Sequence, residues 1–338
     1  MIRFRCQTGT VTLSAGQTWS APSAVNTYRD TSAQELLEII AEVNRGEPWK
    51  DCVGRHYREA YPWLHRIVTD PARDLFFRQH PPATDSLVLD LGAGWGQIAR
   101  PLARRNRVVA LEPTAERLAF IQAAAQQDGL DGRMAYIQSD FLDLEFEDSF
   151  DLVCCIGVLE WVPKFRTGDP WDLQRNFIAR IYRQLAPGGQ LVIGIENRLG
   201  LKYLLGSPDD HIGLPKIAVL DRALAAPRYH AITGQNLRTF TYSAAEYSQL
   251  FAEAGFVRPE FFAALPDYKV PSLIHPADDS FERLLRDQAI PPEHNGSTGA
   301  AFTTALQEDL GSHYRSLATM GISRYFAPSY FIRCTKSD

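Results

Sequence analysis

The chain has 338 residues, of which 45% are apolar, 22% charged and 11% aromatic. These proportions are typical of a globular protein that can bury a full core, and they exclude a collagen-like, coiled-coil or wholly disordered chain. The formal net charge of −5 predicts no nucleic-acid partner. The sequence has no apolar run long enough to span a membrane and no signal-peptide core, and its five cysteines form no Cys-x-x-Cys motif, so we expect a cytoplasmic protein with free thiols.

Residues 1–81 are expected to form an N-terminal arm and a helical cap. The first 30 residues are rich in Ser, Thr, Gln and Gly, which predicts a short strand or a poorly ordered arm. Apolar residues at helical spacing, with Ser32 and Glu35 as a capping box, predict a helix over 32–45. The helical pattern continues over 55–79, interrupted by Pro62 and Pro71.

Apolar runs alternate with helical patterns between residues 82 and 198. Because these runs are apolar on both faces, they are typical of a parallel sheet covered by helices on both sides, in a doubly wound α/β domain. The five runs are SLVLDLGAG, VVALEP, RMAYIQSDF, FDLVCCIGVLEWV and QLVIGIEN.

The C-terminal part is less regular. Residues 199–240 contain three prolines and scattered glycines, and we expect no regular element there. SAAEYSQLFAEAGF predicts a helix that stops at Gly255, and VRPEFFAALP a following strand. Residues 272–327 contain one helical stretch, and the final YFIRCTK predicts a closing strand.

A glycine-rich turn follows the first strand of the α/β region. Gly92, Gly94 and Gly96 lie between that strand and a helix, where backbone must turn sharply and can approach a ligand. A dinucleotide fingerprint needs a third glycine where this chain has Gln97. Asp90, two residues before the first glycine, would repel a pyrophosphate but suits a ligand that carries an ammonium and a sulfonium.

Acidic residues follow the next two strands. Glu112, 20 positions after Gly92, ends the second strand, and a carboxylate there can accept hydrogen bonds from both hydroxyls of a ribose. Asp140 ends the third strand and can accept from an adenine amino group while Phe141 packs on the ring. Polar groups at three successive strand ends predict a nucleoside-binding crevice.

Five segments resemble the class I S-adenosylmethionine-dependent methyltransferases: Val88–Gly96, Glu112, Ser139–Phe141, Phe150–Val153 and Leu185–Gly189. The resemblance covers roughly residues 85–265. It implies a seven-stranded, Rossmann-like sheet whose last strand, from Tyr330, is antiparallel. It also implies S-adenosylmethionine as cofactor, bound by Asp90, Gly92, Gly94, Trp95, Gln97, Glu112, Asp140, Phe141 and Gly157.

A narrower resemblance adds an expectation about the acceptor. The segments 196–203, 207–213 and 266–271 are similar to a bacterial methyltransferase group that is often encoded with, or fused to, glycosyltransferases of surface-polysaccharide assembly. This resemblance implies a glycan or glycoside hydroxyl as the methyl acceptor, and it assigns no catalytic residue.

Three residues are candidates for the catalytic chemistry. His211 is the preferred general base, because Asp209 or Asp210 beside it can orient its ring. Glu160 and Glu196 follow the fourth and fifth strands. These two carboxylates could bind sugar hydroxyls, hold Mg²⁺ or have a structural role, and we assign no metal ligand.

The sequence thus predicts an arm and cap (1–81), a methyltransferase core (82–271), an insertion shaping the substrate site (272–327) and a closing strand (328–338). The expected reaction is methyl transfer to a hydroxyl of a small molecule, sugar or glycan. The alternatives are transfer to carboxylate, nitrogen or carbon, an NAD-dependent oxidoreductase, and a non-catalytic partner subunit. The oligomeric state stays open.

Overall fold

The computed structural model describes residues 1–22, 31–287 and 300–337. The chain divides into two compact units. The first comprises Met1–Ile156, Arg180–Val192 and Thr335–Asp338, and the second comprises Gly157–Ala179 and Ile193–Cys334. Two elements, β9 (Leu185–Glu196) and α7 (Pro170–Gln184), contribute residues to both units.

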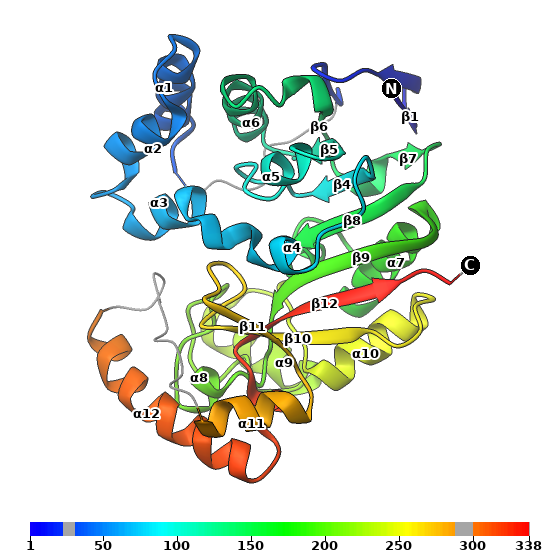
Figure 1. The fold of residues 1–338 in the computed structure, drawn as a ribbon. Coiled ribbons are helices and arrows are strands. Elements are labelled where there is room, and N and C mark those ends of the chain that lie inside the picture. Colours follow the sequence, from blue (N-terminus) through cyan, green and yellow to red (C-terminus); the bar gives the residue numbers. More distant parts are fainter. Residues whose placement is uncertain (23–30, 288–299, 338) are drawn as a thin grey trace. The chain divides into compact units, whose positions relative to one another are not determined.

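The first unit is built on a parallel sheet. Its strands lie in the order β9–β8–β4–β5–β6–β3, so the first strand of the α/β region is central and the chain winds outward in both directions (Figure 1). This order confirms the doubly wound sheet that the alternating apolar runs predict. The strands are β4 (Leu87–Leu91), β5 (Arg107–Leu111), β6 (Met134–Gln138), β8 (Phe150–Ile156) and β3 (Thr18–Ser20).

Helices cover this sheet because their apolar residues recur at helical spacing. The capping box of Ser32 and Glu35 begins α1 (Ala33–Asn44), which packs against α6 (Ala115–Gln127) through one buried face. Pro62 starts α3 at its first turn, and Pro71 starts a short 3₁₀ turn, as their missing N–H groups require. The remaining helices of this unit are α2 (Trp49–Tyr57), α3 (Pro62–Thr69), α4 (Leu75–Gln79) and α5 (Ala99–Ala103).

The N-terminal residues form more strands than we predicted. β1 (Ile2–Cys6) and β2 (Gly9–Leu13) make a hairpin that continues to β7 (Glu145–Phe146), and β3 pairs in parallel with β6 at the edge of the main sheet. Phe4 packs edge-on against Trp19, with ring centroids 5.0 Å apart. The segment 23–30 lies outside the described residues.

The second unit has its own strand order, β11–β10–β12–β9. β10 (Glu260–Leu265) pairs antiparallel with β12 (Ser329–Thr335), which confirms the expected closing strand. β11 (Leu273–Pro276) adds a further antiparallel strand beyond the seven expected. The helices are α8 (Leu201–Leu204), α9 (Arg222–Thr233), α10 (Ala244–Glu253), α11 (Asp279–Asp287) and α12 (Ala300–Thr319).

Two expectations for the second unit are wrong. Residues 222–233 form a helix, because Asp221 caps its first turn and Gly234 ends it in the left-handed region, and Pro227 is tolerated inside it. The insertion contains two helices rather than one, since α11 precedes α12. α11 is fixed by Glu282, whose buried carboxylate accepts hydrogen bonds from the backbone N–H groups of Ser323 and Arg324.

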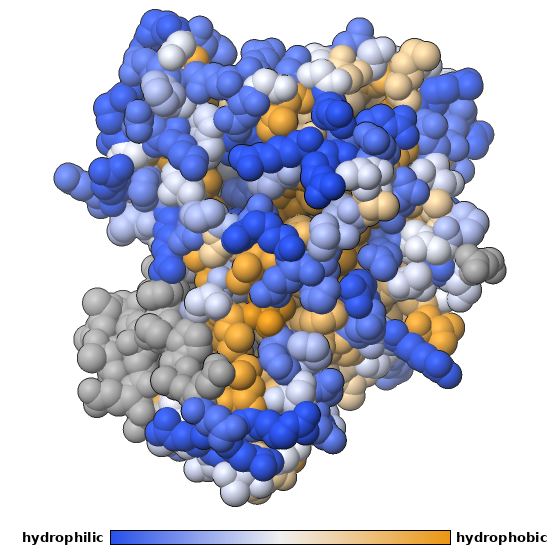
Figure 2. Space-filling model, in the orientation of Figure 1, coloured by the Kyte–Doolittle hydropathy of each residue, from blue (hydrophilic) through white to orange (hydrophobic). Residues whose placement is uncertain are grey.

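All five cysteines are free, as predicted, and Cys154 and Cys155 are buried in β8. None of the helices in the described part of the chain is long and apolar enough to cross a membrane. The face drawn in Figure 2 carries mostly hydrophilic residues with scattered apolar patches.

Candidate active site

The glycine turn after β4 has the backbone that its sequence predicts. Gly92, Gly94 and Gly96 have φ angles of +64°, +58° and +75°, in the region that side chains disfavour. A Cβ at Gly96 would lie 3.0 Å from a side-chain carbon of Ile121, so this glycine also allows α6 to approach the turn. Gln97, at the position of the missing third glycine, accepts a hydrogen bond from the Trp95 N–H at 3.0 Å and shapes the turn.

Glu112 joins this turn to the end of β5. Its carboxylate is buried and accepts hydrogen bonds from the Gly94 N–H at 2.9 Å and the Thr114 N–H at 3.0 Å. Burial raises the pKa of Glu112 above its usual value, although Arg117 and the two N–H groups act in the opposite direction. Because a carboxylate accepts about four hydrogen bonds, Glu112 keeps capacity for ribose hydroxyls.

Asp90 is the least satisfied carboxylate of this region. It is 2% exposed, and its Oδ2 atom has no hydrogen-bond partner. Burial raises its pKa to about 7, despite a hydrogen bond from the backbone of Ala99 and the charge of Arg73. A buried carboxylate oxygen without a donor, next to a glycine turn, is suited to a ligand that brings a positively charged donor.

Two further residues, Asp140 and Phe141, are predicted to contact the adenine of the cofactor. Asp140 accepts a hydrogen bond from the Leu142 N–H at 2.8 Å and so caps the turn that follows β6. Phe141 is buried, with the Arg180 guanidinium 5.8 Å from its ring centre. Their roles in binding adenine stay predictions.

The side chain of Trp95 lies in the core and does not line an open crevice. Its buried ring packs edge-on against Tyr57 at 5.6 Å and Phe120 at 5.1 Å, in a core shared with α1, α2 and α6. Only the backbone of Trp95 is therefore placed to line the turn. Because the ring packs against the N-terminal helices, these helices fix the position of the Trp95 backbone. The spacing of residues in the sequence does not predict this contact.

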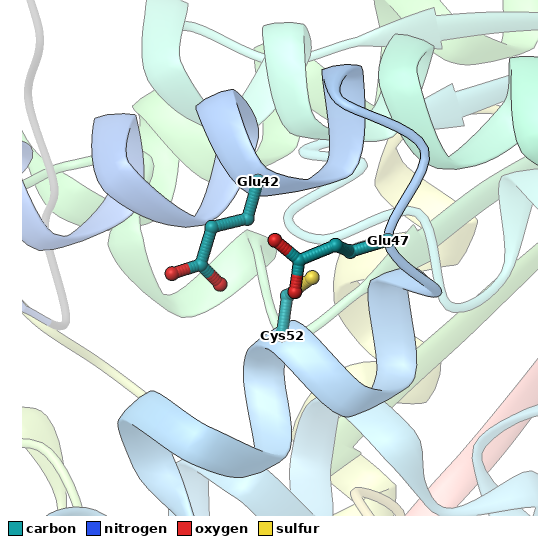
Figure 3. A group of neighbouring side chains, drawn as sticks. All are labelled: Glu42, Glu47 and Cys52. Atoms are coloured by element: carbon teal, nitrogen blue, oxygen red, sulfur yellow. The ribbon is translucent and has the colours of Figure 1, made fainter.

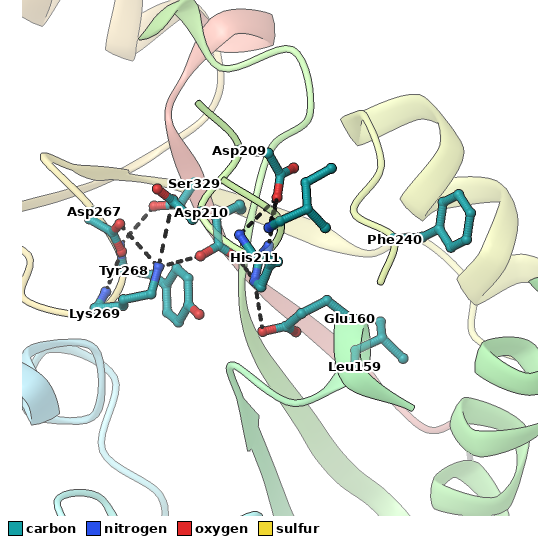
Figure 4. Close-up of polar contacts among 12 residues, drawn as sticks. Leu159, Glu160, Asp209, Asp210, His211, Phe240, Asp267, Tyr268, Lys269 and Ser329 are labelled. Atoms are coloured by element: carbon teal, nitrogen blue, oxygen red, sulfur yellow. Dashed lines mark hydrogen bonds and ion pairs between the residues drawn. The ribbon is translucent and has the colours of Figure 1, made fainter. Parts of the chain in front are cut away.

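A second group of polar residues lies entirely in the second unit (Figure 4). His211 is at its centre. Its Nε2 atom is 3.6 Å from a carboxylate oxygen of Glu160 and 3.6 Å from one of Glu196, and its Nδ1 atom is 3.6 Å from Asp209 Oδ1. The structure thus brings together the three catalytic candidates, which are far apart in the sequence.

These three side chains are buried and poorly satisfied. The exposed fractions of the side chains are 6% for His211, 1% for Glu160 and 0% for Glu196. At 3.6 Å the contacts are ion pairs rather than hydrogen bonds. Both oxygens of Glu160 and the Oε2 atom of Glu196 have no hydrogen-bond partner, and burial raises the pKa of Glu160.

Charges determine the protonation of His211. Burial alone lowers its pKa, but Glu196, Asp209 and Glu160 outweigh burial and raise the pKa well above its usual value. These neighbouring charges therefore favour the protonated form of the ring. For His211 to act as a base, the negative charge around it must first be compensated by another cation.

Two lysines, Lys202 and Lys269, form ion pairs with the carboxylates of this group. Their burial was not expected from the sequence. Lys202 is 2.9 Å from Asp210 Oδ2, which also accepts a hydrogen bond from Tyr203 at 2.9 Å. Lys269 contacts Glu196, Asp210 and Asp267 through its Nζ atom. Asp209, not Asp210, is therefore the acid beside the His211 ring. A lysine inside the otherwise apolar segment LGLKYLLG was the available signal for Lys202.

Three other residues have more local roles. Gly157 has a φ of +72°, and a Cβ there would lie 2.8 Å from the Tyr268 hydroxyl, so only glycine fits this approach. Asn197, next to Glu196, donates hydrogen bonds to the carbonyls of Tyr325 and Ala327, which commits its amide to the fold. His275 lies in β11, and its ring contacts the carbonyl of its neighbour Pro276.

Comparison with known proteins identifies the class of the central segment. Residues 89–193 match the family model described as a methyltransferase domain. Together with the doubly wound sheet, the match makes this part of the chain a class I methyltransferase domain of Rossmann-like fold, whose cofactor is S-adenosylmethionine. The unpartnered Asp90 oxygen, the spare capacity of Glu112 and the glycine turn fit this cofactor.

Relatives share only part of the chain. The chain is 31% identical over 143 residues to a ubiquinone biosynthesis O-methyltransferase of Pseudomonas entomophila (42% of this chain, 57% of that protein), and 29% identical over 120 residues to one of Rickettsia conorii (35% and 38%). It thus spans about 40–60% of the length of these relatives. A solved phosphoethanolamine N-methyltransferase 2 of Haemonchus contortus, bound to S-adenosyl-L-methionine, has 17% identity and a TM-score of 0.45, and covers 89% of this chain and 60% of its own.

Proposed function

We propose that this chain transfers a methyl group from S-adenosylmethionine to a hydroxyl of a small molecule, sugar or glycan. The single observation that carries the proposal is Asp90, a buried carboxylate with an unpartnered oxygen beside the glycine turn of a methyltransferase domain. A carboxylate in this place is suited to the ammonium of the cofactor, whereas it opposes the pyrophosphate of a dinucleotide.

Each set of residues has a separate task in this reaction. Asp90, Glu112 and the turn bind and orient the cofactor, which supplies a methyl group on a positively charged sulfur. The acceptor oxygen forms a bond to the methyl carbon while the carbon–sulfur bond breaks and its electron pair stays on sulfur. The hydroxyl proton must leave in the same process, and the cluster of Glu160, Glu196 and His211 is the proposed acceptor of that proton.

The choice of a hydroxyl rests on two further observations. The curated relatives that this chain matches over 120–143 residues are named ubiquinone biosynthesis O-methyltransferases. The candidate cluster is rich in carboxylates, which accept hydrogen bonds from hydroxyl groups and so suit a polyol or sugar. The resemblance of segments 196–203, 207–213 and 266–271 to methyltransferases of polysaccharide assembly supports a glycan or glycoside among these acceptors.

Cofactor choice is tested first by thermal unfolding. S-adenosylhomocysteine at a hundredfold excess over its Kd should add about 2.7 kcal/mol to the free energy of unfolding and raise the Tm, while NAD and NADP should have no effect. A shift with NAD alone would instead favour the oxidoreductase alternative. Transfer of a labelled methyl group to hydroxyl, amine and carboxylate acceptors then tests the reaction, and labelling of amines alone would exclude O-methylation.

Glu112 provides a residue-level test of cofactor binding. Charged hydrogen bonds contribute about 1.5–3 kcal/mol, so Glu112→Ala should weaken S-adenosylhomocysteine binding by about tenfold to a hundredfold in calorimetric titration. The Tm should also fall, because the N–H groups of Gly94 and Thr114 lose their acceptor. Glu145→Ala removes an exposed carboxylate of the same unit and serves as the control. Unchanged affinity in Glu112→Ala would mean that the ribose is held elsewhere.

A further inference from the structure

Three groups of side chains in the described residues have the atoms to hold a metal ion, and two of them already enclose a cation. Arg55 contacts Glu42, Glu47 and Cys52, whose side chains face one another in Figure 3. Lys269 contacts all three carboxylates of the group Glu196, Asp210 and Asp267. In these two groups a side-chain nitrogen occupies the place that an ion would take.

The third group, Glu160, Glu196 and His211, encloses no lysine or arginine. The atoms that face one another are the Oε1 atom of Glu160, the Oε2 atom of Glu196 and the Nε2 atom of His211. The carboxylate oxygens are fully buried and have no hydrogen-bond partner. Such oxygens are costly unless something binds them, and the Glu160 carboxylate lies directed at His211 (Figure 4).

The distances suit a metal ion. A tetrahedral ion with ligands at about 2.1 Å separates its ligand atoms by about 3.4 Å. Nε2 of His211 lies 3.6 Å from an oxygen of each of the two carboxylates, which is too far for a hydrogen bond. The three facing atoms all lie within 4.8 Å of one another, so small side-chain movements let them share an ion.

Outer partners are also in place. A metal-binding histidine usually donates its other ring N–H to a carboxylate, and Asp209 lies on the Nδ1 side of His211. The second oxygen of Glu196 is held by Lys269, which leaves Oε2 directed to the group. Asp209 itself is fixed by the N–H groups of His211 and Ile212, at 2.8 and 3.1 Å.

The excess of negative charge around His211 also favours a bound cation. Among the described residues, the ion pairs of Glu160, Glu196, Asp209, Asp210 and Asp267 go to Lys202, Lys269 and His211, so acidic side chains outnumber basic ones in this group. A divalent cation compensates most of this excess, and a buried charge that lacks a partner is strongly unfavourable.

We infer that Glu160, Glu196 and His211 bind one divalent transition-metal ion, with Asp209 as the outer partner of the histidine. Two carboxylate oxygens and one imidazole nitrogen suit Zn²⁺ or Mn²⁺ better than Mg²⁺ or Ca²⁺, which prefer oxygen alone. This inference rests on the proposed function for its purpose: an ion with an open position can bind an acceptor hydroxyl and lower its pKa. The binding itself can be measured without any acceptor.

The test uses the full-length, tag-free protein after dialysis against a chelator. Zn²⁺ and Mn²⁺ are titrated calorimetrically, and bound metal is counted by mass spectrometry after gel filtration. We expect one ion per chain. Glu160→Gln and His211→Gln should each weaken binding by about 100-fold or more, and Asp209→Asn by about tenfold to a hundredfold.

Cys52→Ser is the matched control, because it alters the group that Arg55 already fills. It should bind metal as the unmodified protein does. The inference fails if the protein binds neither ion, if Glu160→Gln and His211→Gln bind as tightly as the unmodified protein while circular dichroism shows both folded, or if Cys52→Ser abolishes binding. The Tm shift with S-adenosylhomocysteine is recorded on the same samples. A retained shift without metal binding overturns this inference alone, whereas loss of the shift overturns the proposed function.

Discussion

Replacing His211 by alanine should lower kcat by about 10²–10⁴-fold, the usual effect of losing a group that handles the proton of a nucleophile. The ring is the only element that links Glu160, Glu196 and Asp209 through ion pairs among the described residues. Without it, the three carboxylates lose their shared partner, and the proposed site for release of the hydroxyl proton is lost.

The measurement is methyl transfer under single-turnover conditions with an accepted hydroxyl compound. S-adenosylhomocysteine affinity should change little, because the cofactor is assigned to a different set of side chains. His230→Ala is the matched control, since His230 is exposed on α9 and its ring contacts the Gln235 carbonyl, away from the carboxylates around His211. A purely structural role for His211 predicts a lower Tm with a rate loss below tenfold, and that result would remove it from the catalytic proposal.

Much of the cofactor-binding site could be predicted from the sequence, because the residues that indicate it lie close together in the chain. A buried strand, three glycines and an acid 20 residues later all lie within one winding of the sheet, and the structure places Glu112 on the N–H of Gly94 as this order implies. The pairing of β10 with β12 was predictable only through the family resemblance, because the two strands are separated by the whole insertion.

The charged group of the second unit could be predicted only in part. Glu160, Glu196 and His211 could be chosen as candidates, since each follows a strand or lies beside acids. Their burial could not, because their partners come from distant segments, such as Lys269, which follows β10 and contacts Glu196. Pairing over such distances in sequence leaves no periodic pattern.

Failures of prediction have equally specific causes. Pro227 argued against a helix, yet the cap at Asp221 and the glycine at 234 define α9 around it. The role of Trp95 in cofactor binding stays a prediction, although the structure packs its ring in the core with Tyr57 and Phe120. A residue next to a ligand loop can act through its backbone while its side chain packs elsewhere.

Asp90→Asn should remove most of the pH dependence that one buried carboxyl imposes on stability. The pKa of Asp90 is about 7 in the folded protein, against an ordinary value of 3.8 for an aspartate side chain. Between these values the folded state binds more protons than the unfolded state, so the free energy of unfolding falls as pH rises and levels off above pH 7. A shift of about three pKa units corresponds to about 4 kcal/mol.

Chemical denaturation of both proteins from pH 5 to pH 8 measures this effect. The asparagine should cost a constant amount, about 1–3 kcal/mol, because its amide replaces an unpartnered oxygen by an unpartnered donor. Relative to the unmodified protein, Asp90→Asn should therefore gain about 2.7 kcal/mol of stability as pH rises over this range, because only the two pH units between 5 and the pKa of about 7 contribute. Asp143→Asn, which alters an exposed carboxyl of the same unit, should follow the unmodified protein.

Asp90→Asn also tests whether the charge of Asp90 contributes to cofactor binding. An ammonium near Asp90 favours the charged carboxylate and lowers its pKa, so S-adenosylhomocysteine should bind the unmodified protein more tightly as pH rises through 7. Asp90→Asn should bind it more weakly, without that rise. Parallel stability curves for the two proteins, or equal cofactor affinities at pH 8, would contradict the assignment of Asp90 as a charge kept unpaired for a cationic ligand.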